Sequence, residues 1–417
     1  MKPRILLSSW ISPIPSNSGG AQRTNLLYKA LSEIADVDFV LLSLPGKYTD
    51  HEMEVMREEF RLKACMSIKR PQELAPWKFL PIPRRFLNPI ISNIDEGRSL
   101  LRMRPELREY VDSKVDLNSY DLIVGRYAKS LTALGLHKER SMRLALDFDD
   151  WDLDVYQSRK LSVEGLWRKK ILDWHIYNIR KALPTLINSL SAFWVSNKGN
   201  LDEPLLKGAR FLTNIPFLEE SNESLRIPFP EAGEIITTIG CFAHGPNITG
   251  VDWFLDQVWP LVLKKCPSAR FKICGSNLDP IRLGERWQQH HNVEVVGFVN
   301  KIEDAYKDAM ISVCPVFQGA GTNVKVLESL RLGRPCVCTL KGANGFDDLT
   351  DLGSLVPCQS EFEMAVSIVS FLEDREKAKR LGFSASRKVR DELNFSNFSK
   401  IVAEGVEAAL MSPKPNT

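Results

Sequence analysis

CPVFQGAGTNVKVLESLRLGRPCVCTLKGANG, residues 314–345, joins an apolar run, a glycine-containing turn, one helix and a second apolar strand, and it ends in another glycine cluster. Glycines in the turn at residues 317–322 let the backbone approach a ligand closely. The helix that follows would direct its N–H groups and the positive end of its dipole at whatever lies in that turn. The stretch therefore predicts a strand–turn–helix–strand unit of an α/β fold, with an anion site at the start of the helix.

Lys325 and Glu328 are poorly explained by the stability of this helix. Lys325 lies in the first turn, where the dipole disfavours a cation, and Lys before Glu is the weaker order for an intrahelical pair. The two side chains share a face, beside an apolar stripe that would pack on a sheet. A cation that can bind phosphates, next to an acceptor for hydroxyl groups, suits a sugar nucleotide as the ligand. The alternative is that the two side chains only form a solvated polar face of the helix.

The composition narrows the class of protein. The chain has 417 residues, which favours two or three domains, and 44% apolar with 26% charged residues is typical of a globular protein. A net charge of +3 gives no support for nucleic acid as a partner. The eight cysteines show no paired spacings and the six histidines are scattered, so we expect reduced thiols of a cytosolic protein and no metal site.

Two sequence features bear on location. The N-terminal apolar run is too short for a signal peptide, and no apolar run approaches 18 residues, so we expect a cytoplasmic protein. Residues 70–110 mix aromatic, proline and basic residues, and nine basic against five acidic side chains lie in residues 69–110. If exposed, this segment would suit an anionic membrane surface, whereas a packed helical hairpin is the alternative reading.

The first half of the chain alternates strands and helices in the way that is typical of a doubly wound sheet. Helices are predicted from about residue 21 and over residues 163–191. Strands are predicted at residues 4–10, 37–44, 65–69, 121–126, 143–148, 192–196 and 211–215.

Polar residues follow three of these strands, at the edge where open α/β sheets bind ligands. Gly19 and Gly20 precede the first helix with Arg23 nearby, and they either bring a ligand to that helix or form a plain tight turn. Arg126 ends a strand, and Asp149 follows the next one within an acidic run at residues 147–150. Those aspartates could take part in chemistry or simply cap the next helix.

A linker is predicted at residues 221–233, and the alternation then restarts. Strands are predicted at 235–242, 270–275, 293–299, 311–316 and 354–356, and helices from about 247, at 280–290, from about 361 and at 395–411. We therefore predict a first domain at 1–220, a second at 234–394 and a last helical segment at 395–417.

These motifs make the chain resemble a glycosyltransferase of the GT-B fold. It is similar to the retaining glycosyltransferase family 4 through Gly-x-Gly-Thr-x-x-Lys-x-x-Glu at 319–328, Gly-Arg-Pro at 333–335 and Gly-Ala-Asn-Gly at 342–345. It also resembles a bacterial subgroup associated with exopolysaccharide synthesis, through His-Gly-Pro-Asn at 244–247 and Val-Gly-Phe-Val at 296–299. The resemblance implies two Rossmann-like, doubly wound parallel-sheet domains facing a cleft, with the C-terminal helix crossing back to the first domain.

The resemblance also implies roles for residues. Lys325 would contact the donor diphosphate and Glu328 the ribose hydroxyls, with Arg126 or Arg23 helping to neutralise the phosphates. Ala320 stands where relatives often carry a sugar-contacting Glu, and His244 would contact phosphate or sugar, or only pack within its loop. The remaining donor-binding positions are Gly319, Ala320, Gly321, Thr322, Asn323, Gly297, Phe298 and Val299, and the acceptor-binding positions are Gly19, Gly20, Arg23 and Asp149.

The implied function is transfer of a sugar from a nucleotide-diphosphate sugar to a glycan or lipid-linked acceptor, with retention and with neither a metal nor another cofactor. No nucleic acid is expected as a partner, and the protein would lie in the cytoplasm or at the inner face of the membrane. Two alternatives remain. The first is a GT-B protein that binds its ligand without catalysis, which would suit Ala320 and the lack of the family's frequent Arg and Lys after residue 241. The second is a nucleotide-sugar epimerase.

Overall fold

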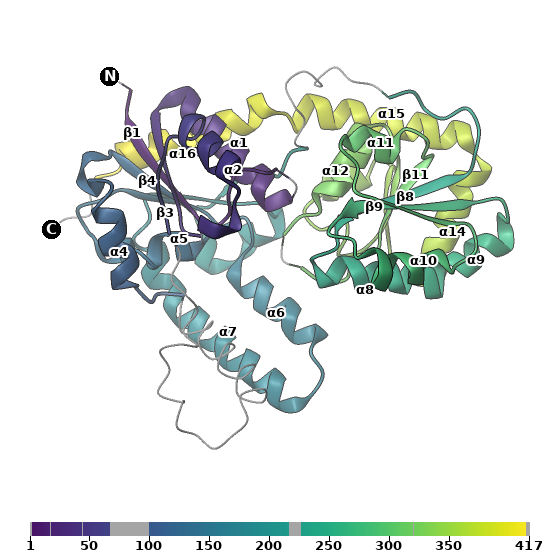
Figure 1. The fold of residues 1–417 in the computed structure, drawn as a ribbon, viewed down its shortest axis with the longest axis horizontal. Helices are drawn as coiled ribbons and strands as arrows, with labels where there is room; N and C mark the ends of the chain where they lie inside the picture. The colour runs from purple at the N-terminus through teal and green to yellow at the C-terminus, as the bar shows by residue number, and fades with distance from the viewer. Residues whose placement is uncertain are drawn as a thin grey trace. The chain divides into compact units, whose positions relative to one another are not determined.

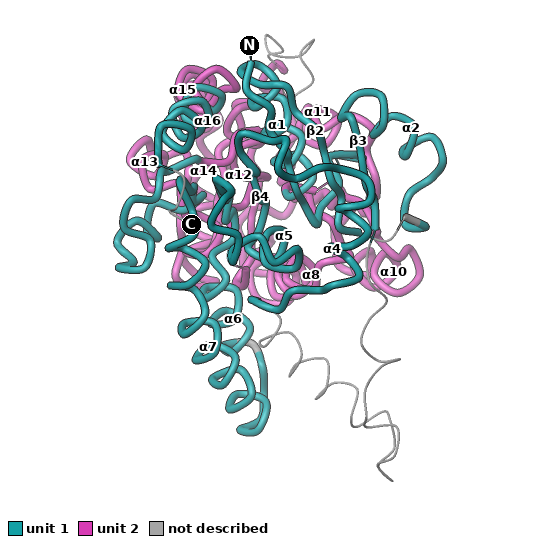
Figure 2. Tube along the Cα trace, turned by 90° about the vertical axis from the view of Figure 1, so that its left-hand side faces the viewer, with its two compact units in different colours: residues 1–16, 20–212, 398–417 teal, residues 17–19, 213–397 magenta. Residues whose placement is uncertain are grey.

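The computed structural model describes residues 2–16, 18–43, 45–66, 100–216, 227–319 and 321–413. The chain divides into two compact units, the first made of residues 1–16, 20–212 and 398–417 and the second of residues 17–19 and 213–397 (Figure 2). Residues 70–99 of the segment predicted to suit a membrane, residues 221–226 of the predicted linker and Ala320 lie outside the described residues.

The first unit is built on a seven-stranded parallel sheet with the order β3-β2-β1-β4-β5-β6-β7. Its central strands are continuous apolar runs because both faces of a parallel sheet are covered by helices. The strands are β1 (Arg4–Ser9), β2 (Asp36–Leu41), β3 (Leu62–Cys65), β4 (Leu122–Arg126), β5 (Leu144–Asp147), β6 (Ala192–Val195) and β7 (Arg210–Phe211).

Helices cover both faces of this sheet, and Figure 1 shows α1 and α16 on one side of the strands and α4 and α5 on the other. The α-helices of this unit, within the described residues, are α1 (Gly19–Ile34), α2 (Asp50–Glu58), α4 (Pro105–Asp112), α5 (Ala128–Thr132), α6 (Asp152–Ser162), α7 (Leu166–Ile187) and α16 (Phe395–Met411). No helix within the described ranges is both long and apolar enough to cross a membrane.

The last helix, α16, packs on the sheet of the first unit. Trp194 of β6 donates its indole N–H to the carbonyl oxygen of Ile401 at 3.4 Å. A Cβ atom at Gly405 would lie 2.4 Å from the ring of Trp194, so only glycine allows the helix to approach this closely. The chain therefore returns, after the second unit, to complete the first.

The second unit contains a six-stranded sheet with the order β10-β9-β8-β11-β12-β13, again parallel at every described pair. Its strands are β8 (Ile235–Cys241), β9 (Arg270–Ser276), β10 (Val293–Gly297), β11 (Ile311–Cys314), β12 (Cys336–Thr339) and β13 (Leu355–Cys358). Its helices are α8 (Gly245–Trp253), α9 (Trp259–Lys265), α10 (Glu285–Gln288), α11 (Ile302–Tyr306), α12 (Val324–Arg331), α13 (Asp347–Thr350), α14 (Glu361–Glu373) and α15 (Arg375–Glu392). The prediction of two doubly wound parallel sheets is confirmed.

Two regions of the first unit differ in their bounds from the elements that the sequence predicted. The third strand, β3, lies at Leu62–Cys65 and begins three residues before the strand predicted at 65–69, of which residues 67–69 lie outside the described part of the chain. It is an edge strand, in which Lys63 reaches Asp38 at 3.5 Å, so it lacks the continuous apolar run of the buried strands. The helix predicted over residues 163–191 is α7, which spans Leu166–Ile187, and a separate helix, α6, precedes it and ends at Ser162. Gly165, with a positive φ of 95°, lies between the two helices.

Helix α8 approaches the end of β11 very closely. A Cβ atom at Gly250 would lie 2.2 Å from the carbonyl oxygen of Pro315, the residue that follows β11. Such a distance is a hard overlap with backbone, so a side chain at this position must displace the helix. Gly250 thus sets the distance between α8 and the loop after β11.

We predict that Gly250→Ala lowers the free energy of unfolding by about 1–3 kcal/mol, the usual cost of overpacking. Gly245→Ala, on the same helix, is the matched control, because its Cβ atom would meet nothing within 4 Å. Denaturant unfolding of both variants measures the difference. Equal stability of the two would contradict the close approach of α8 to Pro315.

Candidate functional site

The strand order of the second sheet reverses between β8 and β11, which lie side by side. Loops leave the carboxyl ends of both strands at this point, one leading into α8 and the other, at residues 315–323, into α12. Open α/β sheets bind ligands outside such a reversal, because the two loops diverge there. The topology therefore brings the predicted anion site to the position in the sheet where a ligand is most readily accommodated.

Lys325 is held above the end of β8. Its Nζ donates a hydrogen bond to Oδ1 of Asn247 at 2.7 Å, and Nδ2 of Asn247 donates to the carbonyl oxygen of Cys241 at 2.8 Å. A Cβ atom added at Gly240 would lie 3.4 Å from Nζ, so the small residue leaves room for the ammonium group. Asn247 is neutral, and the positive charge of Lys325 is therefore not cancelled by this partner.

Glu328 lies one turn further along α12 and is 8% exposed. Tyr306, on α11, donates its hydroxyl hydrogen to the carbonyl oxygen of Lys325 at 3.2 Å. Burial, and then the negative charge of Glu328, raise the pKa of Tyr306 well above its ordinary value. The phenol thus stays protonated and acts as a fixed donor that braces the first turn of α12.

The loop before α12 is braced from three sides within the second unit. Nδ2 of Asn214 donates to Oγ1 of Thr322 at 2.7 Å, and Nδ2 of Asn323 donates to the carbonyl oxygens of Lys341 and Gly342 at 3.3 and 3.4 Å. The rings of Phe317 and Trp253 meet edge to face with centroids 4.7 Å apart. The two glycine clusters of residues 314–345 are therefore joined, and the loop shape is set before any ligand arrives.

The structure does not bring all of the predicted donor-binding residues together. Thr322 and Asn323 lie next to α12, whereas Gly297 ends β10, an edge strand that is separated from β8 by β9. Phe298 is 65% exposed beyond that strand. His244 is exposed at the start of α8 and makes no side-chain capping bond there. The remaining predicted positions on this loop, Gly319 and Gly321, are described, whereas Ala320 is not.

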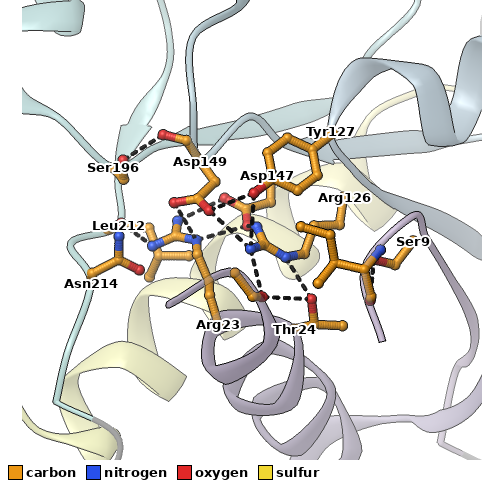
Figure 3. Close-up of polar contacts among 12 residues, drawn as sticks. Ser9, Arg23, Thr24, Arg126, Tyr127, Asp147, Asp149, Ser196, Leu212 and Asn214 are labelled. Carbon is orange, nitrogen blue, oxygen red and sulfur yellow. Dashed lines mark hydrogen bonds and ion pairs between the residues drawn. The ribbon is translucent and has the colours of Figure 1, made fainter. Parts of the chain in front are cut away.

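A second polar cluster lies at the carboxyl ends of β4 and β5 in the first unit (Figure 3). Arg23 of α1 binds Asp147 with two hydrogen bonds, from Nε at 2.8 Å and from Nη2 at 2.7 Å. Arg126 donates to Asp147 at 3.1 Å and to Asp149 at 2.9 Å. Two guanidinium groups thus alternate with two carboxylates, so their charges compensate one another where water is excluded.

The burial of this cluster bears on the predicted roles of its arginines. Arg126 is 0% exposed and also donates to Oγ1 of Thr24 at 2.8 Å and to the carbonyl oxygen of Gly20 at 2.9 Å, and Arg23 is 1% exposed. The contact of either arginine with a diphosphate stays a prediction, and this enclosure weighs against it. Asp149 and Gly20 lie in the same cluster, as expected for residues at one edge of the sheet.

The backbone at this edge is strained. Tyr127 and Asp149 have positive φ angles of 66° and 45°, a conformation that costs about 1–3 kcal/mol for residues other than glycine. The hydroxyl of Tyr127 donates to Oδ2 of Asp149 at 3.1 Å, which couples the two strained positions. Helix α6 is capped by Trp151 without a side-chain bond, so capping does not explain Asp147 or Asp149. Strain of this kind, at the edge that binds ligands, marks a candidate binding site.

Carboxylates next to this cluster titrate unusually. Burial raises the pKa of Asp150 from 3.8 to about 7, helped by the negative charge of Asp149, and burial raises the pKa of Asp152 to about 6. Sequence reasoning placed Asp150 at this edge but could not predict its desolvation. Among the described residues, no group of three or more His, Cys, Asp or Glu side chains is arranged to hold a metal ion.

The sequence of the second unit resembles that of known proteins. Residues 233–374 match the family described as glycosyl transferases group 1, so the second unit contains a domain of that group. An uncharacterized 44.6 kDa protein from the cps region of Klebsiella pneumoniae is 24% identical over 168 residues, which are 38% of this chain. That match spans 42% of the relative, less than half of its length.

Solved structures share the fold over nearly the whole chain. Sucrose-phosphate synthase of Thermosynechococcus elongatus has a TM-score of 0.63 at 16% identity, covering 98% of both chains. TarM of S. aureus, solved with fondaparinux, α-GlcNAc-glycerol and UDP, has a TM-score of 0.62 at 12% identity, covering 99% of this chain and 100% of that one. HepE of Anabaena, solved with UDP and glucose, has a TM-score of 0.58 at 11% identity, covering 98% and 100%. The fold is that of the GT-B glycosyltransferases, as the sequence predicted.

The pKa of Asp150 predicts a pH dependence of stability. Because the folded protein binds this proton more tightly than the unfolded chain, the group lowers stability as the pH rises from about 4 through about 7. Asp150→Asn imitates the protonated form, so it should match the unchanged protein near pH 4 and exceed its free energy of unfolding by about 1–3 kcal/mol at pH 8. Denaturant unfolding across this range measures the difference.

Asp351→Asn, at an exposed carboxylate, controls for the loss of one negative charge. A difference between Asp150→Asn and the unchanged protein that stays constant across the pH range would contradict the raised pKa.

Proposed function

We propose that this protein transfers a sugar from a nucleotide-diphosphate sugar to a glycan or lipid-linked acceptor. The group 1 domain and the GT-B fold support the class of reaction. The observation that carries the proposal is Lys325, whose ammonium group is held by neutral Asn247 at the switch point of the second sheet, beside the N-terminus of α12. A cation and a helix start at one ligand-binding edge form a site for a diphosphate.

The donor is proposed to bind at α12. In this arrangement Lys325 and the backbone N–H groups at the start of the helix hold the diphosphate, and Glu328 accepts hydrogen bonds from the ribose. The structures of TarM and HepE were solved with UDP, which supports a nucleotide of this class for the present protein. We propose that the chain is of the retaining family 4 type, and the cps-region relative supports a role in polysaccharide synthesis.

The chemistry requires stabilisation of the leaving group. As the bond between sugar and diphosphate breaks, negative charge grows on the phosphate oxygens and the sugar acquires oxocarbenium character. Groups that are already oriented toward that charge stabilise the transition state without reorganising. Lys325 is oriented by Asn247, and the first turn of α12 by Tyr306, so the proposed mechanism needs no metal ion.

The acceptor is proposed to bind at the carboxyl edge of the first sheet. Tyr127 and Asp149 are the strained residues there, and Asp149 is the polar group best placed to meet an acceptor hydroxyl. Arg126 lies beneath them and acts, in this proposal, by fixing the position of Asp149. The protein is proposed to act in the cytoplasm, because its proposed donor, a nucleotide sugar, is found there.

We predict that Lys325→Ala weakens the binding of UDP or GDP by about 10- to 150-fold, equivalent to about 1.5–3 kcal/mol for a charge-assisted hydrogen bond. Isothermal titration calorimetry measures the affinity. Lys379→Ala, at an exposed lysine of α15 in the same unit, is the control for charge and should bind as the unchanged protein. Unchanged affinity in Lys325→Ala would remove this residue from the site.

Activity is tested with UDP-, GDP- and ADP-sugars and an extract of glycan and lipid-linked acceptors. Release of nucleoside diphosphate that depends on the acceptor, with a labelled sugar recovered in the acceptor, is the expected result. Binding of a nucleotide sugar without transfer would favour a binding subunit, and conversion of the donor without acceptor would favour an epimerase.

A further inference from the structure

The far end of the α6–α7 hairpin, residues 157–170, carries large apolar side chains that are mostly exposed. Leu161 is 86% exposed, Leu166 79% and Trp167 80%. We call residues 157–170 the hairpin tip. A scattered single apolar residue on a surface needs no explanation, but three such residues on one short turn form a patch that indicates an interaction surface.

The hairpin tip has no packing role that would account for these residues. Every residue from 164 to 170 is exposed, so the first five residues of α7, from Leu166 to Lys170, are exposed on all sides of the helix. Burial begins only further along, where α7 packs on its own unit through Leu172, His175, Ile179, Leu183 and Leu186. In both views the far end of the hairpin extends away from the first sheet (Figure 1 and Figure 2). Among the residues that the structure describes, none covers the patch, and it can meet a partner.

The charge of the hairpin tip selects among partners. It contains five basic residues and one acidic residue. The ammonium group of Lys170 lies 5.6 Å from the ring centroid of Trp167, and Lys160 pairs with Asp173. Arg168 and Lys169 follow Trp167 directly on the exposed turn. Apolar side chains surrounded by basic residues, with a Trp at their centre, are the combination that favours the interface of an anionic bilayer.

We infer that the hairpin tip docks on the surface of a membrane that contains anionic phospholipids. Leu161, Leu166 and Trp167 enter the interface between headgroups and acyl chains, and Arg168 and Lys169 contact the phosphates. A second copy of the chain is a poorer occupant, because a symmetric contact would bring two basic tips together. This inference does not rest on the proposed transferase activity, although a membrane surface is where a lipid-linked acceptor would be met.

The test is co-sedimentation of the full chain with vesicles of phosphatidylcholine containing about 30% phosphatidylglycerol, and with phosphatidylcholine alone, at low salt. Binding is expected to the anionic vesicles only and to fall at about 0.5 M salt, where exposed charges are screened. Leu166→Ser with Trp167→Ser removes the apolar contact and should weaken binding at least about tenfold. Arg168→Glu with Lys169→Glu reverses two charges and should do the same.

Lys379→Glu with Arg380→Glu is the matched control, because it makes the same change of charge on exposed residues of α15. It should bind vesicles like the unchanged protein. Melting temperature and UDP affinity should be the same in the tip variants, which separates loss of docking from misfolding and from loss of the nucleotide site.

Three outcomes would overturn the inference. The unchanged protein could fail to bind anionic vesicles at low salt. The tip variants could bind them as well as the unchanged protein does, which would place the membrane contact elsewhere. Gel filtration could show an oligomer that only the tip variants lose, without vesicle binding, which would assign the patch to a protein contact.

Discussion

A parallel sheet gathers the carboxyl ends of its strands at one edge, and both units depend on this constraint for the polar groups that they place together. In the first unit Arg126 and Asp147 end neighbouring strands, so a cluster forms from residues that are far apart in sequence. In the second unit the reversal between β8 and β11 brings α8 and α12 together at the same kind of edge. The candidate sites follow from the winding of the sheets.

The charged side chains at the two edges differ in their partners. In the first unit two arginines meet two aspartates in a buried network, which is stable only while every partner is present. In the second unit Lys325 meets a neutral amide, which orients the ammonium group without cancelling its charge. An anion would therefore meet an uncompensated positive charge at Lys325, whereas the charge of Arg126 is already shared with two carboxylates. The arginines of the first unit are thus held by compensating charges, whereas the ammonium group of Lys325 keeps a positive charge that a ligand could use.

Local pattern predicted the elements better than it predicted their contacts. The strand–turn–helix reading of residues 314–345 and the last helix at residues 395–411 were confirmed, because continuous apolar runs and helical periodicity are local signals. Edge strand β3 begins three residues before its predicted start, because its apolar pattern is weaker. The motif at residues 244–247 contains Asn247 but does not predict its hydrogen bond to Lys325, because the two residues are 78 positions apart. The pairing of Arg23 with Asp147 spans 124 positions, and only the topology reveals it.

The central claim is that a nucleoside diphosphate binds with its phosphates at Lys325 and the first turn of α12. A crystal structure of the protein soaked with UDP tests this claim most directly. We expect diphosphate oxygens within hydrogen-bonding distance of Nζ of Lys325 and of the backbone N–H groups at the start of α12, with the ribose near Glu328. Diphosphate density at another place in the second unit, with Nζ of Lys325 still bonded only to Asn247, would contradict it.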